Sequence, residues 1–227
     1  MTAPALPIQT PGVVSAIDSY NNWLQARIGK VTSSDVWRVC KKLKDGSPSK
    51  ERRNYMLRLI AEHLTGQPTE HYMSQPMQWG IETEPQARAA YEARMNEAVQ
   101  ADLGFVDHPR IPKAGCSPDG FVDRDGLIEI KCPETRTHLA TLIGEPIEEN
   151  YIYQMMWQMA CTGRAYCDFW SFDSRLPLAA QVFRKRFERD QKLIDSMERD
   201  VIFFLQDMSQ CLERIEEGGA HIPSEHV

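Results

Sequence analysis

One hairpin constrains the fold of this chain most, because its second half is the clearest candidate for a buried central strand. Leu127–Ile130 is apolar except at one position, and it follows Phe121-Val122 after a turn that contains Asp125-Gly126. Asp-Gly between two such runs favours a tight hairpin. Because side chains alternate along a strand, Glu129 and Lys131 should project from the same face. The sequence therefore predicts a sheet whose central strand presents charged groups on one face.

Helical patterns flank this hairpin on both sides. Thr32 or Ser33 can cap a short helix that reaches about Leu43, and Ser47-Pro48 can open a second helix that Gly66 ends. Further patterns are typical of helices over residues 77–99 and 151–162, and of strands over residues 165–172 and 178–187.

Two further features complete the expected organisation. Proline lacks an amide donor, so Pro85 should start or kink the helix over residues 77–99. Apolar residues between Leu193 and Ile215 recur at helical spacing and predict a long C-terminal helix. The first dozen residues contain three prolines and should form a flexible arm, 1–12. We therefore expect one α/β domain over residues 13–227, with a central mixed β-sheet flanked by helices.

The charge of the chain is unevenly distributed. The net charge of −6 excludes a uniformly basic nucleic-acid coat. Between Arg27 and Arg58, however, ten lysines and arginines stand against three acidic residues, a local charge of +7, so the rest of the chain carries −13. A basic region joined to an acidic body is compatible with a polyanionic partner. A solvated connector over residues 41–50 explains the same surplus equally well.

Several classes of protein are excluded by the sequence. With 227 residues and 42% hydrophobic residues, the chain can bury a core. Its apolar stretches fall far short of the roughly 20 residues that cross a bilayer, so we expect no membrane contact. The N-terminal residues carry no positive charge ahead of their few apolar residues, unlike a secretory signal. The six cysteines lack C-x-x-C spacing, which favours reduced thiols in a cytoplasmic protein over a cysteine-bound metal.

The hairpin also gathers the residues best suited to chemistry. Asp119 immediately precedes the first strand, so the turn can return Glu129 beside it. Two converging carboxylates repel each other unless a cation lies between them, and hard oxygen ligands suit Mg²⁺ or Mn²⁺. With Lys131 beside such a metal, the group could activate water and neutralise charge at phosphorus, as phosphodiester hydrolysis requires. Taken alone, Glu-x-Lys on a strand is more often an exposed polar face.

The pattern Pro118-Asp119, spacer, Glu129-x-Lys131 resembles the PD-(D/E)xK nuclease superfamily. Motifs from Trp23 onward resemble one group within it, the YqaJ-type viral recombinases. These motifs are Trp23-x-x-x-Arg27-x-Gly29-x-Val31-Thr32-Ser33-Ser34, Trp79-Gly80 with Glu84, Cys116-Ser117-Pro118-Asp119-Gly120, Glu129-Ile130-Lys131-Cys132-Pro133 and Tyr151-x-x-Gln154.

The resemblance implies a role for each residue of the acidic cluster. Asp119, Glu129 and the backbone carbonyl of Ile130 would hold two Mg²⁺ ions, for which Mn²⁺ could substitute. Lys131 would be the catalytic lysine, and Glu84 a helix acid that acts near the metals through water. The alternative interpretation of Glu84, less favoured than a place at the site, is a first-turn acid at a helix N-terminus. The proline directly after it departs from the family pattern and alters the backbone freedom there.

The resemblance also implies a pocket for the 5′-phosphate of a DNA end, formed by Arg27, Ser34, Ser117 and Gln154. The chemistry is suitable, because a guanidinium pairs with phosphate oxygens while hydroxyls and an amide donate further hydrogen bonds. Without the resemblance, simpler interpretations are favoured: Ser34 as a helix cap, Ser117 as a turn residue and Gln154 as a polar helix position.

The function that the resemblance implies is a Mg²⁺-dependent 5′-to-3′ exonuclease on linear double-stranded DNA. It would prefer 5′-phosphorylated ends, release 5′-mononucleotides and leave 3′ overhangs. A homotrimeric ring, a single-strand annealing partner and a phage or prophage origin in the bacterial cytoplasm are also implied. The alternatives are a superfamily endonuclease or single-strand nuclease and, less favoured because Asp119, Glu129 and Lys131 are all present, a non-catalytic DNA-end-binding scaffold.

Overall fold

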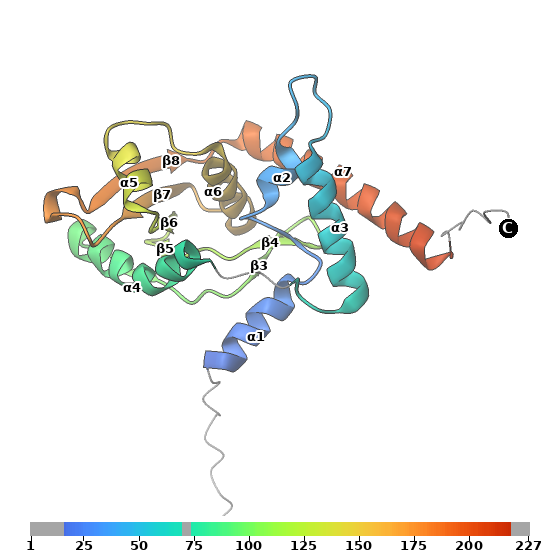
Figure 1. Ribbon diagram of the computed structural model, residues 1–227, viewed down its shortest axis with the longest axis horizontal. Coiled ribbons are helices and arrows are strands. Elements are labelled where there is room, and N and C mark those ends of the chain that lie inside the picture. Colours follow the sequence, from blue (N-terminus) through green and yellow to red (C-terminus); the bar gives the residue numbers. More distant parts are fainter. Residues whose placement is uncertain (1–15, 70–73, 219–227) are drawn as a thin grey trace, which may run out of the picture.

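The computed structural model describes residues 16–69 and 74–218 (Figure 1). The arm expected over residues 1–12 lies outside the described residues. The helices are α1 (Ala16–Arg27), α2 (Val36–Cys40), α3 (Lys50–Thr65), α4 (Gln75–Met95), α5 (Thr135–Leu142), α6 (Glu149–Thr162), the 3₁₀ helix η1 (Leu178–Ala180) and α7 (Gln191–Glu216). The strands are β1 (Val31–Thr32), β2 (Val99–Gln100), β3 (Val106–Asp107), β4 (Ala114–Cys116), β5 (Gly120–Val122), β6 (Gly126–Lys131), β7 (Tyr166–Phe172) and β8 (Val182–Glu188).

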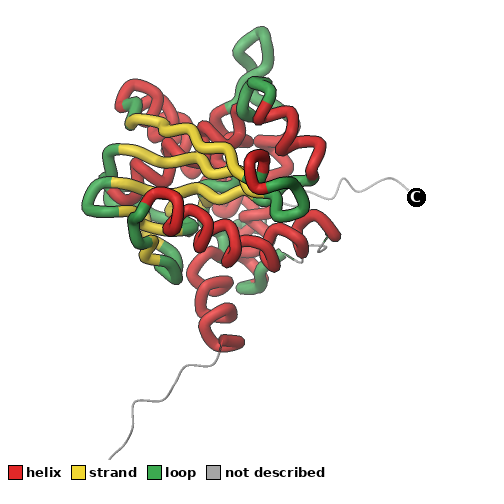
Figure 2. Tube along the Cα trace, turned by 90° about the vertical axis from the view of Figure 1, so that its left-hand side faces the viewer, coloured by secondary structure: helices red, strands yellow, loops and turns green. Residues whose placement is uncertain are grey.

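Two sheets organise the molecule. The larger has the strand order β2-β5-β6-β7-β8, and its strands lie side by side in Figure 2. In this sheet β6 and β7 are parallel, whereas the other neighbours are antiparallel. The smaller sheet has the order β1-β4-β3, and β1 pairs with β4 in parallel. The expected mixed α/β fold with a central mixed sheet is thus confirmed, and β6 lies at the centre of the larger sheet.

The two faces of β6 are buried by different helices. Leu127 belongs to the larger hydrophobic core, which includes the buried faces of α6 and α7. Ile128 and Ile130 belong to a second core, which contains Ala87 and Tyr91 of α4. Because side chains alternate along the strand, Glu129 and Lys131 project with Leu127 toward α6. The sequence prediction that these two charged residues share a face is therefore confirmed.

The N-terminal helices differ from the prediction in their caps. Thr32 lies in β1, and α2 begins only after Asp35, so neither Thr32 nor Ser33 caps it. The second predicted helix, α3, is capped by Ser49, whose side chain accepts a hydrogen bond from the amide of Arg52 at 3.2 Å. Its end is as expected, because Gly66 adopts a left-handed φ of 64° that other residues rarely adopt.

Two other boundaries were also predicted wrongly. Helix α4 continues through Pro85 and ends at Met95, where Asn96 adopts a left-handed φ of 54°. Val99, expected at the end of this helix, instead lies in the short strand β2. The strand expected from residue 178 begins at Val182, after the 3₁₀ helix η1. The long C-terminal helix is confirmed as α7, which packs on α2, α3 and α6.

Candidate functional site

Glu129 is a fully buried carboxylate at the centre of the larger sheet. Both of its oxygens accept hydrogen bonds. Lys131 Nζ, two residues further along β6, donates to Oε1, and Gln158 Nε2 of α6 donates to Oε2 at 2.7 Å. Because a buried polar group is costly unless it is hydrogen-bonded, these two donors compensate the burial of the Glu129 carboxyl group. Gln158 has no role in the sequence prediction.

Asp119 lies beside the same strand, as the hairpin predicted. Gly120 pairs with Ile128 in the β5–β6 ladder, which brings the preceding residue, Asp119, next to Glu129. Asp119 Oδ2 accepts a hydrogen bond from the amide of Ile130 at 2.7 Å. Burial and then the negative charge of Glu129 raise the pKa of Asp119 well above its ordinary value. The two carboxylates therefore form one electrostatically coupled pair.

Lys131 supplies the positive charge of this cluster. Burial alone would lower its pKa, but the charges of Glu129 and Asp119 outweigh this effect and raise it above the ordinary value. Its Nζ lies 3.5 Å from Gln154 Oε1 and 4.8 Å from the centroid of the Tyr151 ring. The ammonium group is therefore held between β6 and α6.

Glu84 reaches the cluster from the other side, on α4. Its Oε1 accepts a hydrogen bond from Arg88 Nη2 at 2.7 Å, one helical turn further along. Glu84 lies near enough for its negative charge to contribute to the raised pKa of Asp119. Although Pro85 follows directly, α4 is not interrupted there.

Two open pockets meet at the acidic residues. The first, about 770 Å³, is lined by the four residues predicted to bind a 5′-phosphate, Arg27, Ser34, Ser117 and Gln154. The second, about 530 Å³, is lined by Ile130, Lys131 and Tyr151 among others. Glu84 and Asp119 line both pockets. All nine predicted site residues except the buried Glu129 thus border this pair of pockets.

Arg27 is a half-buried cation of the first pocket, at the C-terminal end of α1. Its guanidinium carbon lies 4.2 Å from the centroid of the Trp23 ring, and Nη1 lies 3.4 Å from Ser117 Oγ. Trp23 Nε1 donates a hydrogen bond to that same hydroxyl at 2.8 Å. Burial lowers the pKa of Arg27, but arginine remains charged in proteins. No acidic side chain in the described residues forms an ion pair with Arg27, so its donors remain available to an anion.

Ser34 borders the same pocket from the turn between β1 and α2. Its Oγ lies 3.3 Å from Thr32 Oγ1. Asp35, not Ser34, is the residue at the cap position of α2. Ser117 lies just after β4. Gln154 enters the pocket from α6, one turn before Gln158.

The donor set of the cluster is suited to a hard divalent cation. Two adjacent carboxylates, Asp119 and Glu129, and the carbonyl of Ile130 between Glu129 and Lys131 are oxygen donors of the kind that Mg²⁺ prefers. Within residues 16–69 and 74–218 no group of three or more His, Cys, Asp or Glu side chains is arranged to hold a metal. A metal here would therefore depend on the carboxylate pair together with backbone oxygen and water. Both oxygens of Glu129 already accept hydrogen bonds, so direct coordination would replace one of them.

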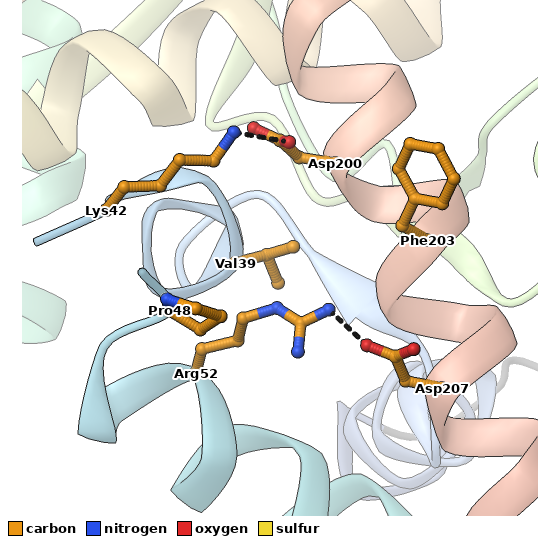
Figure 3. Close-up of a pocket in the computed structure, with 7 residues that line it drawn as sticks. All are labelled: Val39, Lys42, Pro48, Arg52, Asp200, Phe203 and Asp207. Atoms are coloured by element: carbon orange, nitrogen blue, oxygen red, sulfur yellow. Dashed lines mark hydrogen bonds and ion pairs between the residues drawn. The ribbon is translucent and has the colours of Figure 1, made fainter. Parts of the chain in front are cut away.

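Most cations of the basic region form ion pairs, and four of them pair with acids outside the region. In the pocket of Figure 3, Lys42 pairs with Asp200 at 2.9 Å and Arg52 pairs with Asp207 at 2.7 Å, which links the connector after α2 and the first turn of α3 to α7. Six of the ten cations form ion pairs: Lys30, Lys41, Lys42 and Arg52 with acids outside the region, and Arg38 and Arg58 with Asp35 inside it. Of the other four, Arg27 alone lines the first pocket. The surplus of +7 therefore overstates the charge available to DNA.

Comparison with known families identifies the chain. The model of the YqaJ-like viral recombinase domain matches residues 22–165, more than half of the sequence. This chain belongs to that family. The matched range begins one residue before Trp23 and includes both carboxylates and Lys131. The family resemblance seen in the sequence is confirmed.

Solved structures agree with this membership. An alkaline exonuclease, LHK-Exo, from Laribacter hongkongensis is 44% identical, with a TM-score of 0.81, and the match covers 88% of this chain and 98% of that one. The structure of LHK-Exo in complex with dAMP matches with a TM-score of 0.82. A phage-related exonuclease from Haemophilus somnus 129PT, 16% identical with a TM-score of 0.65, covers 82% of this chain and 96% of its own, and shows the shared fold. No curated protein sequence matches.

This YqaJ-like protein is therefore an enzyme of a nuclease family. No helix in the described part of the chain is long and apolar enough to span a membrane. Three residues of its site have no role in the sequence prediction: Gln158, Trp23 and Arg88. The spacing of Gln158, one helical turn after Gln154, is a signal that could have indicated the first of these.

Proposed function

We propose that this protein is a Mg²⁺-dependent exonuclease that degrades linear double-stranded DNA from 5′-phosphorylated ends. It releases 5′-mononucleotides and leaves 3′ single-strand overhangs. One observation carries the proposal: the pocket with the half-buried Arg27, which forms no ion pair within the described residues, meets the pocket with Lys131, and Glu84 and Asp119 line both. A site for an end phosphate thus adjoins a site for hydrolysis.

The first pocket selects the end of the strand. The guanidinium of Arg27 pairs with phosphate oxygens, and the hydroxyls of Ser34 and Ser117 and the amide of Gln154 donate further hydrogen bonds. Trp23 packs on the Arg27 guanidinium and bonds Ser117, which holds two of these groups in place before DNA arrives. Contacts to phosphate set the register without reading sequence, so degradation proceeds from any end.

The second pocket performs the hydrolysis. When bound, Mg²⁺ lowers the pKa of water and stabilises negative charge on the phosphate and the leaving oxygen. Asp119, Glu129 and the Ile130 carbonyl would hold the metal, and Glu84 would act at its edge. Lys131 directs its ammonium group at the attacking water, while Gln158 keeps the Glu129 carboxylate in a fixed orientation. Water attacks phosphorus, the bond to the 3′ oxygen breaks, and the end nucleotide leaves with its 5′-phosphate.

The product class has support from a relative. The 44% identical LHK-Exo has been solved in complex with dAMP, a mononucleotide. Stepwise release from a 5′ end gives mononucleotides, whereas cleavage within the duplex gives longer fragments. A mononucleotide complex of so similar a protein therefore supports the exonuclease over an endonuclease.

The proposal extends to assembly and partners through the family resemblance. The protein would act as a homotrimeric ring around DNA and pass its 3′ overhang to a single-strand annealing protein during phage recombination in the bacterial cytoplasm. Exposed cations of the connector and α3 that form no ion pair in the described residues, Lys44, Lys50 and Arg53, are candidates to contact the DNA backbone. Sedimentation of the free protein tests the trimer directly.

A panel of matched substrates tests the proposed activity. The enzyme with Mg²⁺ is given the same plasmid as closed circles, as linear duplex and as denatured single strands. We expect loss of the linear duplex alone. Cutting of closed circles would instead indicate an endonuclease, preference for denatured strands a single-strand nuclease, and binding without cleavage in Mg²⁺ or Mn²⁺ a scaffold.

A further inference from the structure

A second arginine borders the pocket that holds Arg27. Arg88 of α4 lines this pocket, and its side chain is 24% exposed. Nη2 donates to Glu84 Oε1 at 2.7 Å, whereas Nε is buried without a hydrogen-bond partner in the described residues. A guanidinium carries five N–H donors, so most of the hydrogen-bonding capacity of Arg88 is unused.

An ordinary helix-surface pair does not account for this arrangement. Exposed pairs four residues apart stabilise a helix by about 0.3–0.5 kcal/mol and keep both side chains in water. Arg88 is instead drawn into a pocket at the cost of an unpaired buried nitrogen, a cost that folded proteins seldom retain without a functional reason. The unused donors therefore indicate a ligand.

The charge of the pocket indicates which ligand. Its charged lining residues are Arg27, Arg88, Glu84, Asp102 and Asp119, two cations against three acids. A 5′-phosphate is itself an anion, and with Arg27 alone it would enter a pocket with a net negative lining. A second guanidinium reduces this repulsion and adds charge-assisted hydrogen bonds to phosphate oxygens.

We propose that Arg88 is a second phosphate-binding arginine of this pocket, and that the same guanidinium positions Glu84. One edge of the group holds the carboxylate at the boundary of the two pockets, and the other edge contacts the phosphate of the DNA end. This inference rests on the proposed function, because it assigns Arg88 to the end-binding pocket. Binding of the 5′-phosphate and the placement of Glu84 would then both depend on the Arg88 side chain.

Equilibrium binding without divalent cations tests the proposal, because it measures end recognition separately from cleavage. Duplexes with a 5′-phosphate or a 5′-hydroxyl are titrated with wild type, Arg88→Gln, Arg88→Lys and the control Arg94→Gln. Arg94 lies on the exposed side of the same helix and lines neither pocket. We expect Arg88→Gln to reduce the preference for the 5′-phosphate about tenfold, as loss of a charged hydrogen bond implies, and Arg94→Gln to leave it unchanged.

Arg88→Lys keeps the charge but loses the planar donor pair, so its preference should fall between those of wild type and Arg88→Gln. This variant decides the matter if Arg88→Gln does not fold. A preference equal to that of wild type in a folded Arg88 variant overturns the proposal.

Two further comparisons separate the causes. Combining Arg88→Gln with Glu84→Gln shows whether Arg88 acts on the phosphate itself. We expect Arg88→Gln to reduce the preference in the Glu84→Gln background as well, and an effect that disappears there would mean that Arg88 only positions Glu84. Failure of the proposed function would look different, since the wild type itself would then show no preference for the phosphate.

Discussion

Replacing Lys131 with alanine removes one of the two hydrogen-bond donors of a fully buried carboxylate. Glu129 has no exposed surface, and only Gln158 would continue to bond it. Removing one partner of a buried ion pair costs about 3–5 kcal/mol, because the other charge is left uncompensated. Lys131 itself is 23% exposed, so water can enter the vacated space. We therefore expect Lys131→Ala to lower the free energy of unfolding by about 3 kcal/mol, the lower end of that range.

The effect on catalysis should be larger than the effect on folding. Loss of a group that positions or transfers a proton in the transition state slows hydrolysis by about 10²–10⁴-fold. Single-turnover digestion of a 5′-phosphorylated duplex measures this rate, and urea unfolding with and without Mg²⁺ measures the stability. We expect Mg²⁺ to reduce the stability difference from wild type, because a cation bound at Asp119 and Glu129 compensates the negative charge that Lys131 no longer neutralises.

Lys192→Ala is the matched control for this variant. Lys192 lies on the exposed surface of α7 and forms no ion pair in the described residues, so stability and rate should stay close to wild type. A folded Lys131→Ala enzyme that digests DNA at the wild-type rate would refute the assignment of the hydrolytic site. A variant as stable as wild type would refute the electrostatic account of Glu129.

Three further changes test other parts of the structure. Arg27→Gln should abolish the preference for 5′-phosphate over 5′-hydroxyl ends while cleavage continues. Digestion of the two duplexes in parallel measures this preference, and a preference equal to that of wild type would contradict the role of Arg27. Hydrogen bonds from Arg175 and Thr135 outweigh burial and lower the pKa of Asp173 to about 2. Since this folded-state value lies below the ordinary 3.8, Asp173 stabilises the fold above about pH 4 and loses that contribution as the pH falls toward 2, at most about 2 kcal/mol. In Asp173→Asn the free energy of unfolding should fall less steeply between about pH 4 and pH 2 than in wild type, and the same pH dependence in both proteins would contradict this account. Combining Asp200→Asn with Asp207→Asn releases Lys42 and Arg52, the two cations of Figure 3, from their ion pairs. DNA binding should then strengthen, and the plot of log binding constant against log salt concentration should become steeper by about one per cation. An unchanged slope would show that these cations do not face DNA.

The hairpin was the most predictable part of the molecule, for a physical reason. Alternation along β6 and the tight turn before it place Asp119, Glu129 and Lys131 together through local geometry alone. The helix ends were less predictable, because capping depends on tertiary context. Thr32 is drawn into β1 by pairing with Gly115 of β4, and the short helix then starts after Asp35 instead.

Contacts between distant segments lay beyond what the sequence pattern could predict. Helix α1 was not expected, because its residues form only a weak amphipathic pattern, yet it carries Trp23 and Arg27 to the pocket. Gln158 contacts Glu129 from 29 positions away, and its spacing one helical turn after Gln154 is the one local signal of a place at the site. The basic region shows the same limit, since two of its cations pair with Asp200 and Asp207 of α7, which lie far along the chain.

Analysis of the first product from a 5′-labelled duplex tests the central claim most directly. If the pocket of Arg27 holds the end phosphate while hydrolysis occurs at Asp119, Glu129 and Lys131, the label must leave first as a single 5′-mononucleotide. Wild-type enzyme with Mg²⁺ should release only this species at the earliest times, and Lys131→Ala should release none. Labelled fragments of two or more nucleotides as the first product would contradict the assignment of the two adjoining pockets.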